Sequence, residues 1–175
     1  KIISENNYTL EEYLNEFSAV ILVNKEQNMT SFDVVNEISH LFGIKKVGHT
    51  GTLDPDASGV LVLCINEACK LVQFLEHDSK EYIAEILIGK STDTFDKTGN
   101  TTNDVIVKNL TNEEVDKCLK LFLGKIEQIP PIYSAIKVNG KKLYDYAKNG
   151  EKVEILARNI NIYSLKRVSD INDMK

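Results

Sequence analysis

The residues best suited to chemistry lie in a fifteen-residue stretch over 47–61, with the sequence VGHTGTLDPDASGVL. It holds His49 and two carboxylates, Asp54 and Asp56, among three glycines and a proline. Pro55 fixes its own φ angle and biases Asp54 toward an extended backbone, and glycines allow conformations that are closed to other residues. A carboxylate held in this way is presented by its loop, and it can act as a nucleophile or a base without prior activation.

Two other interpretations of the same residues stay open at this level. In the first, Asp54 and Pro55 only make a turn, and His49 is a satisfied polar residue. In the second, residues 54–58 match the Asp-x-Asp-x-Thr/Ser pattern of phosphatases that use an aspartate nucleophile and magnesium. Those enzymes place the pattern directly after an apolar strand, whereas glycine and threonine precede it here, which argues against a phosphatase.

The elements around this stretch can be predicted from periodicity. The spacing of Val35, Ile38 and Phe42 predicts a helix over 31–42 that stops at Gly43. Apolar runs predict buried strands over 19–23 and 60–65, and residues 45–59 are predicted to be an ordered loop.

The rest of the chain mixes helices and strands without strict strand–helix–strand alternation, which predicts an α+β fold. A capped amphipathic helix is expected over 9–17, and a second helix is expected over 67–76 with Ala68, Leu71, Val72 and Leu75 facing inward. The remaining predictions are a strand over 80–89, a polar loop over 90–104, a helix from the cap Thr111/Glu114 to near Gly124, a hairpin of 133–138 and 141–144 around Asn139-Gly140, and a strand over 153–168.

Composition narrows the function classes. The chain has 175 residues and a net charge of -5, but residues 125–167 carry nine Lys/Arg against four Asp/Glu, a net of +5. Such a segment suits either a local phosphate-binding face or a solvated surface. Three cysteines argue against a disulfide framework, no Cys/His spacing suits zinc, and no apolar run approaches the roughly 20 residues of a membrane helix. We therefore expect no metal, no membrane association and a cytoplasmic location, with an organellar location left open.

The stretch over 47–61 resembles the catalytic motif of TruB-type tRNA pseudouridine synthases, Gly-His-Thr-Gly-x-Leu-Asp-Pro-x-Ala-x-Gly-x-Leu, at every fixed position. The resemblance extends over about 19–168. It includes ILVNK and MTSFD near the start, although Glu26 stands where proline is usual. It continues with EACK at 67–70, where Cys69 replaces threonine, KEY at 80–82, PPIYSAIK at 130–137 and GKKLY at 140–144.

This resemblance implies a pseudouridine synthase fold, with a mixed, mostly antiparallel sheet flanked by helices. It implies isomerisation of uridine to pseudouridine in the T-loop of tRNA (position 55), without a cofactor or a metal. Asp54 matches the catalytic aspartate, and Tyr82 matches the tyrosine that stacks on the target uracil. His49 matches a histidine that fills the space left by flipped bases, and Lys70 is expected to help hold phosphates. The partner is the T-arm stem-loop of tRNA, and the protein is expected to be a monomer.

The resemblance also has limits. Residues 1–18 lie outside the pattern and are expected to form a helical extension, and 19–175 form a catalytic domain that is truncated before a later arginine motif and a PUA-like domain. The arginine of that motif pairs with the catalytic aspartate, so the chain alone is expected to be weakly active or inactive. A non-catalytic RNA-binding or tRNA-folding module therefore remains the alternative.

Overall fold

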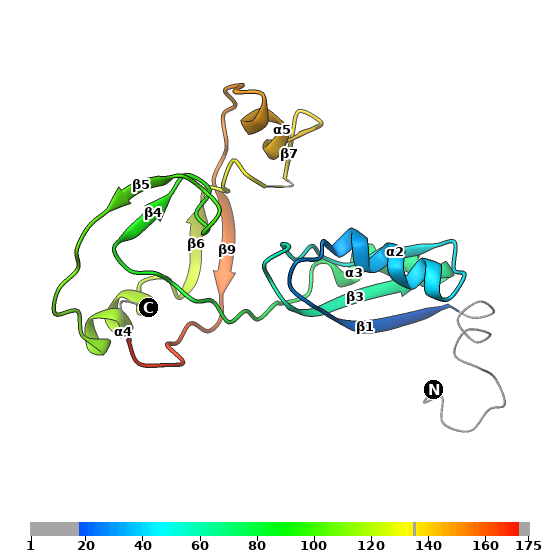
Figure 1. Ribbon diagram of the computed structural model, residues 1–175, viewed down its shortest axis with the longest axis horizontal. Coiled ribbons are helices and arrows are strands. Elements are labelled where there is room, and N and C mark those ends of the chain that lie inside the picture. The colour runs from blue at the N-terminus through cyan, green and yellow to red at the C-terminus, as the bar shows by residue number, and fades with distance from the viewer. Residues whose placement is uncertain (1–17, 135, 172–175) are drawn as a thin grey trace. The chain divides into compact units, whose positions relative to one another are not determined.

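The computed structural model describes residues 18–134 and 136–171 (Figure 1). The chain forms two compact units, Lys1–Tyr82 and Ile83–Lys175, and each is described by itself. This division was not predicted. The helix expected over 9–17 lies outside the described residues.

A three-stranded antiparallel sheet forms the base of the first unit. Its strands are β1 (Ala19–Lys25), β2 (Val47–His49) and β3 (Gly59–Ile65), in the order β1-β3-β2. The two predicted strands are confirmed. The loop expected over 45–59 is wrong at its start, because β2 pairs with the end of β3 and its backbone groups are satisfied within the sheet.

Helix α2 (Ser31–Leu41) lies along this sheet (Figure 1). It begins at a capping box in which Thr30 and Asp33 satisfy each other's backbone amides, and the hydrogen bonds from Thr30 lower the pKa of the Asp33 carboxyl below its usual range. The helix buries Val34 and Val35 against β3. Ile38 and Phe42 are partly buried against the core, so the inward face predicted for this helix is confirmed.

The segment after β3 is helical, as predicted, but it is not one α-helix. It consists of the 3-10 helix η1 (Asn66–Leu71) and the short α3 (Val72–Leu75). Ala68 is buried as expected, whereas Leu71 is exposed. The predicted inward stripe fails at Leu71 because the helix changes there from three to 3.6 residues per turn.

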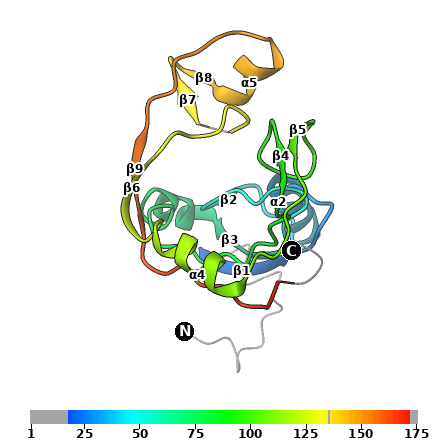
Figure 2. The same cartoon turned by 90° about the vertical axis from the view of Figure 1, so that its left-hand side faces the viewer.

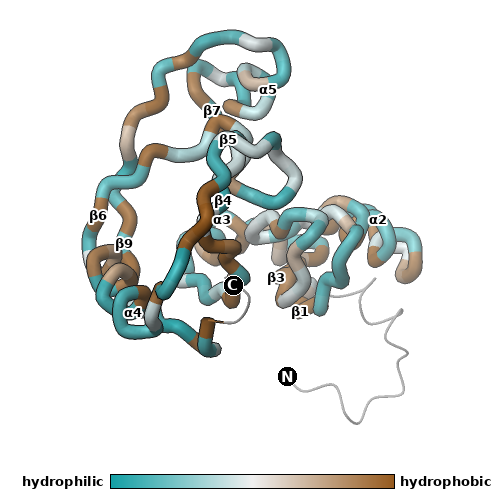
Figure 3. The backbone as a smooth tube through the Cα atoms, turned by 60° about the vertical axis from the view of Figure 1, so that its left-hand side comes forward, coloured by the Kyte–Doolittle hydropathy of each residue, from teal (hydrophilic) through white to brown (hydrophobic). Residues whose placement is uncertain are grey.

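In the second unit, β4 (Lys90–Thr92) and β5 (Thr101–Asp104) form a hairpin where a polar loop over 90–104 was expected. The strand predicted over 80–89 is wrong, because none of these residues pairs with another strand in the described part of the chain. Their apolar side chains remain exposed, Ile83 by 84% and Ile86 by 64%. In Figure 3 the tube that leads into β4 is coloured as hydrophobic. Alternation of apolar residues makes a strand only where a neighbouring strand is present.

Helix α4 (Asn112–Lys120) has the capping box predicted from Thr111 and Glu114. It ends four residues earlier than expected, because Gly124, with φ +86, instead begins β6 (Gly124–Gln128). This strand pairs with β9 (Arg158–Ile162), which is the part of the strand predicted over 153–168 that is observed as a strand.

The hairpin predicted at Asn139-Gly140 is confirmed, with φ values of 52° and 81° at its two turn residues, as a type I′ turn requires. Its arms are shorter than expected, β7 (Lys137–Val138) and β8 (Lys141–Lys142), and α5 (Leu143–Lys148) follows at once (Figure 2).

The fold is therefore α+β, as predicted. All strand pairs within the described residues are antiparallel, but they form four small sheets where one sheet was expected. Of the nine buried hydrophobic residues within 18–134 and 136–171, eight belong to the first unit and Leu143 is the ninth. The core thus lies beneath the segment that carries Asp54.

Candidate functional site

The loop that carries Asp54 is fastened to the start of α2 by one buried serine. The Leu53 amide donates to Ser31 Oγ at 2.9 Å, and the Ser31 hydroxyl donates back to the Leu53 carbonyl at 3.2 Å. Ser31 is only 2% exposed, and Leu53 packs against the core of α2 and β3. The residue before Asp54 is therefore fixed by both of its backbone polar groups and by its side chain.

A second attachment follows directly after Asp54. The Asn28 amide donates to the Pro55 carbonyl at 2.8 Å, and the Ala57 amide donates to the Asp54 carbonyl at 3.0 Å, which closes a tight turn. Asn28 has φ +66, a conformation that asparagine tolerates better than most residues. Residues on both sides of Asp54 are thus held, Leu53 by Ser31 at the start of α2 and Pro55 by Asn28 in the preceding turn.

This segment is itself fixed by a buried cation. Lys25 is 1% exposed, and its Nζ donates to the carbonyls of Glu26 at 2.9 Å and Met29 at 2.7 Å. These bonds close the turn that contains Asn28 and replace the water that the ammonium group loses on burial. Lys25 therefore stabilises the turn whose Asn28 amide holds the Asp54 loop.

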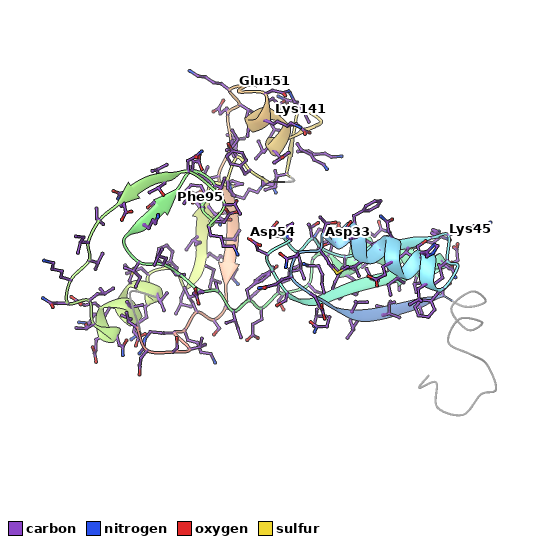
Figure 4. All side chains as sticks on the ribbon, viewed as in Figure 1. Asp33, Lys45, Asp54, Phe95, Lys141 and Glu151 are labelled. Atoms are coloured by element: carbon purple, nitrogen blue, oxygen red, sulfur yellow. The ribbon has the colours of Figure 1, made fainter. Side chains whose placement is uncertain are left out.

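The Asp54 side chain itself is exposed. It forms no recorded hydrogen bond or ion pair with residues 18–134 or 136–171. A carboxylate on a fixed backbone that is not occupied by protein donors is available to a ligand. Figure 4 shows Asp54 and Lys45 at opposite ends of the first unit.

The glycines of this stretch contribute less backbone freedom than their number suggests. Of the three, only Gly59 has a positive φ, +138. Gly48 lies within β2, and an added Cβ would meet Cys69 Sγ and a Val72 methyl at ordinary contact distances of 3.6 Å. The expectation of special conformations at Gly48 and Gly51 is therefore wrong, because strand pairing and the hydrogen bonds of Leu53 shape the loop instead.

His49 is the last residue of β2, opposite Leu63 in β3. The ring is half-buried, and its Nδ1 atom is fully buried without a hydrogen-bond partner among the described residues. A buried polar atom without a partner is costly and is therefore uncommon.

Tyr82 and Lys70 take up different surroundings. Tyr82 ends the first unit, and its ring is 68% exposed. Lys80, two residues earlier, donates to the carbonyls of Glu76 and Asp78, and its Cε would lie 3.7 Å from a Cβ added to Gly51. The chain before Tyr82 therefore passes beside the Asp54 loop.

Lys70 is exposed and forms an ion pair with Glu67 at 2.5 Å, and Lys46 approaches the same carboxyl at 3.4 Å. The pairing raises the pKa of Lys70 and lowers that of Glu67. Among the described residues, no contact brings Lys70 to Asp54; its ion-pair partner, Glu67, belongs to η1.

The sequence did not assign a role to Ser31, Lys25 or Asn28. Ser31 and Lys25 are the only buried polar residues among those described. The sequence holds only a partial signal for them: Lys25 ends an apolar strand and Ser31 directly follows a helix cap. Lysine and serine are seldom buried, so their burial was not expected from their types. In the described part of the chain, no three His, Cys, Asp or Glu residues are grouped as metal ligands would be, and none of the helices is long and apolar enough to cross a membrane.

Comparison with known proteins decides the family. The model of the TruB family pseudouridylate synthase (N terminal domain) matches residues 39–173. The chain belongs to the TruB family. This match covers the Asp54 loop, His49, Lys70 and Tyr82.

Individual TruB relatives agree. The chain is 49% identical over 153 residues to the tRNA pseudouridine synthase B of Bacillus pumilus, covering 87% of this chain and 50% of that protein. It is 46% identical over 157 residues to its Listeria innocua counterpart, covering 90% and 52%, and 50% identical over 149 residues to that of Caldanaerobacter subterraneus, covering 85% and 52%. The chain thus spans about half the length of the curated relatives it matches.

Among solved structures, the chain is similar to one in the crystal structure of a Cbf5-Nop10-Gar1 complex. The TM-score is 0.47 at 26% sequence identity, with 74% of this chain and 33% of the other chain covered.

Proposed function

We propose that this chain carries the catalytic aspartate of a tRNA pseudouridine synthase, and that this aspartate is Asp54. The observation that supports the proposal most directly is the fixed backbone on both sides of an exposed carboxylate, through Ser31 with Leu53 and Asn28 with Pro55. A catalytic group must be held within a fraction of an ångström of its productive position, and this loop has the attachments to do so.

The proposed reaction converts uridine to pseudouridine in the T-loop. The bond between uracil N1 and the ribose C1′ breaks, the base turns, and a bond forms between C5 and C1′. The hydrogen on C5 leaves as a proton and N1 gains one, so that no oxidant, reductant or water is consumed. Asp54 acts on the sugar, either as a nucleophile at C1′ or as a base.

Substrate binding follows from three further residues. The exposed side chain of Tyr82 would stack on the uracil, and base–aromatic stacking contributes about 1–3 kcal/mol. Unstacking a base costs roughly a few kcal/mol, and the stacking contribution offsets part of that cost. His49 would contact the RNA through the exposed part of its half-buried ring, and Lys70 would add a cation at the surface.

The basic segment over 125–167 supplies the phosphate contacts in this proposal. Seven of its nine cations are exposed, namely Lys125, Lys137, Lys142, Lys148, Lys152, Arg158 and Lys166. Two are engaged within the second unit: Lys141 with Glu151 at 2.6 Å, and Arg167 with Asp116 at 3.1 Å. We further propose that the protein is monomeric and cytoplasmic and that it binds the T-arm of tRNA.

The decisive test measures release of tritium from a T-arm stem-loop that contains 5-tritiated uridine, with enzyme in excess. Because the chain spans about half the length of its curated relatives, the same assay is run on a chimera in which this chain replaces the corresponding half of the Bacillus pumilus relative. We expect Asp54→Asn to abolish release, at least a thousandfold, because the amide is neither a nucleophile nor a base. Asp56→Asn, two residues away in the same loop, is the matched control and should retain most of the activity.

Other outcomes would contradict the assignment. Equal release by the wild-type chimera and its Asp54→Asn variant would remove Asp54 from catalysis. An Asp56→Asn variant as damaged as Asp54→Asn, together with a magnesium requirement, would favour the phosphatase interpretation.

A second candidate is a non-catalytic RNA-binding or tRNA-folding module. It is favoured by one observation: no cation is paired with the Asp54 carboxylate among residues 18–134 and 136–171. Fluorescence anisotropy with a labelled stem-loop separates the two. Tight binding that Asp54→Asn leaves unchanged, without tritium release by the wild-type chimera, would establish the module.

A further inference from the structure

The turn that joins β4 to β5, residues 93–100, is organised by its own side chains. The Asp96 carboxylate accepts hydrogen bonds from the hydroxyls of Thr94 at 2.7 Å and Thr98 at 2.6 Å, and from the Thr98 amide at 2.8 Å. Asp93 in turn accepts from the backbone and the side-chain amide of Asn100 at 2.8 and 3.2 Å. These bonds lower the pKa of the Asp96 carboxyl, Thr98 contributing most.

Close packing at Gly99 adds to this order. A Cβ added to Gly99 would lie 2.2 Å from Thr94 Oγ1, 2.4 Å from Asp93 Oδ1 and 2.9 Å from the Thr94 amide nitrogen. The turn therefore has no room for a side chain at position 99.

Phe95 is the exception within this ordered turn. Its ring is 80% exposed, and its backbone has φ +63, in the left-handed region that bulky residues rarely adopt. Its amide is held by a hydrogen bond to the Thr92 carbonyl at 3.3 Å. Glycine or asparagine would fit this conformation with less strain, and neither would place an aromatic ring in water. Such strained positions persist where the surrounding structure fixes them, and they concentrate at functional sites.

The surroundings of the ring indicate what it binds. Over 90–104 the hairpin has two lysines and three aspartates, a net charge of -1, so it is poorly suited to phosphate contacts. The face of an unpaired base is uncharged, and stacking on an aromatic ring tolerates this charge.

We propose that Phe95 stacks on an unpaired base of the RNA substrate and so positions that RNA (Figure 4). The inference rests on the proposed function, which supplies the RNA. It makes Phe95 a positioning residue beyond the stretch over 47–61.

The test exploits the strain. Phe95→Gly removes the ring and relieves the backbone, so the variant should melt no lower than the wild-type chain, while its Kd for a fluorescein-labelled T-arm stem-loop should rise roughly tenfold, as loss of one stacked base predicts. Phe95→Tyr retains the ring and should bind within about twofold of the wild-type chain. Leu121→Ala, which removes another exposed apolar side chain, is the matched control and should leave the Kd unchanged.

Each other outcome overturns the inference. An unchanged Kd for Phe95→Gly means that the ring does not contact the RNA, and an altered elution volume of that variant in size-exclusion chromatography without a change in Kd means that it contacts protein. Lack of stem-loop binding by the wild-type chain defeats the stacking inference. Binding that depends on Phe95, with no tritium release by the wild-type chimera, supports the inference and defeats only the proposed enzymatic function.

Discussion

The loop around Asp54 and the turn over 93–100 are both polar, glycine-containing connections, yet they are held in opposite ways. The Asp54 loop is held from outside, by Ser31 at the start of α2, by Asn28 between β1 and α2, and by the packing of Leu53 on the core. The 93–100 turn is held from within, by Asp93, Asp96 and the threonines beside them.

The difference has a consequence for function. Because the anchors of the Asp54 loop belong to the core of the first unit, changes outside the loop should alter the position of the Asp54 carboxylate. The 93–100 turn depends on residues within eight positions of one another, so changes elsewhere should leave it intact. The predictions below test this contrast, from the largest expected effect to the smallest.

Ser31→Ala should have the largest effect. It leaves two backbone groups of Leu53 without their partner in a buried site, which costs about 1–3 kcal/mol of unfolding free energy. Because Asp54 follows directly, tritium release by the chimera should also fall, by roughly tenfold to a hundredfold.

Ser39→Ala is the matched control, since the Ser39 hydroxyl donates to the Ile44 carbonyl at the other end of the same helix. Chemical denaturation should show a loss for both variants, with activity reduced only by Ser31→Ala. Equal losses of activity would contradict an external anchor specific to Asp54.

Gly99→Ala and Gly51→Ala should separate the two connections. The new methyl group at Gly99 meets atoms at 2.2–2.9 Å, whereas at Gly51 it meets only the Lys80 Cε at 3.7 Å. We expect Gly99→Ala to cost about 1–3 kcal/mol and Gly51→Ala to remain within about 0.5 kcal/mol of the wild-type chain. Thermal denaturation checks both values, and the reverse order would show that the Asp54 loop is the more tightly packed connection.

Thr30→Ala and Thr111→Ala compare two capping boxes of the same design. Each should cost about 1 kcal/mol of unfolding free energy. Thr30 lies between the Lys25-stabilised turn and Ser31, so its loss should also reduce tritium release, whereas Thr111→Ala should not. Equal activities of the two variants would show that the start of α2 does not influence the Asp54 loop.

The smallest expected effect is a pH dependence confined to the 93–100 turn. The pKa of Asp96 is lowered in the folded chain, first by Thr98 and then by Thr94, so the bonds are fully present above the aspartate's usual pKa of about 3.9 and are lost as the pH falls through the lowered value. The chemical shift of the Thr98 amide should therefore change with pH, with a midpoint below about pH 3.9. In Thr98→Val the Asp96 side-chain resonance should titrate at a higher pH than in the wild-type chain. A Thr98 amide midpoint above the usual aspartate pKa would contradict the hydrogen-bond network.

Features that depend on neighbours in sequence were predictable, namely the cap at Thr111, the Asn139-Gly140 turn, the strands β1 and β3 and the inward face of α2. The motif on which the proposed catalytic role of Asp54 rests was likewise visible in the sequence alone. Its chemistry requires certain residue types at fixed spacing, and spacing along a chain is visible without a structure.

Only the tertiary structure showed how that carboxylate is held. Ser31 reaches Leu53 across 22 positions and Asn28 meets Pro55 across 27, because α2 and β3 pack on the same core. The apolar alternation over 80–89 failed for a related reason, since a strand needs a partner whose place the sequence does not specify. Local hydrogen bonds and turns are determined by residues close together in the sequence. Burial and long-range pairing are instead determined by which segments the folded chain brings together.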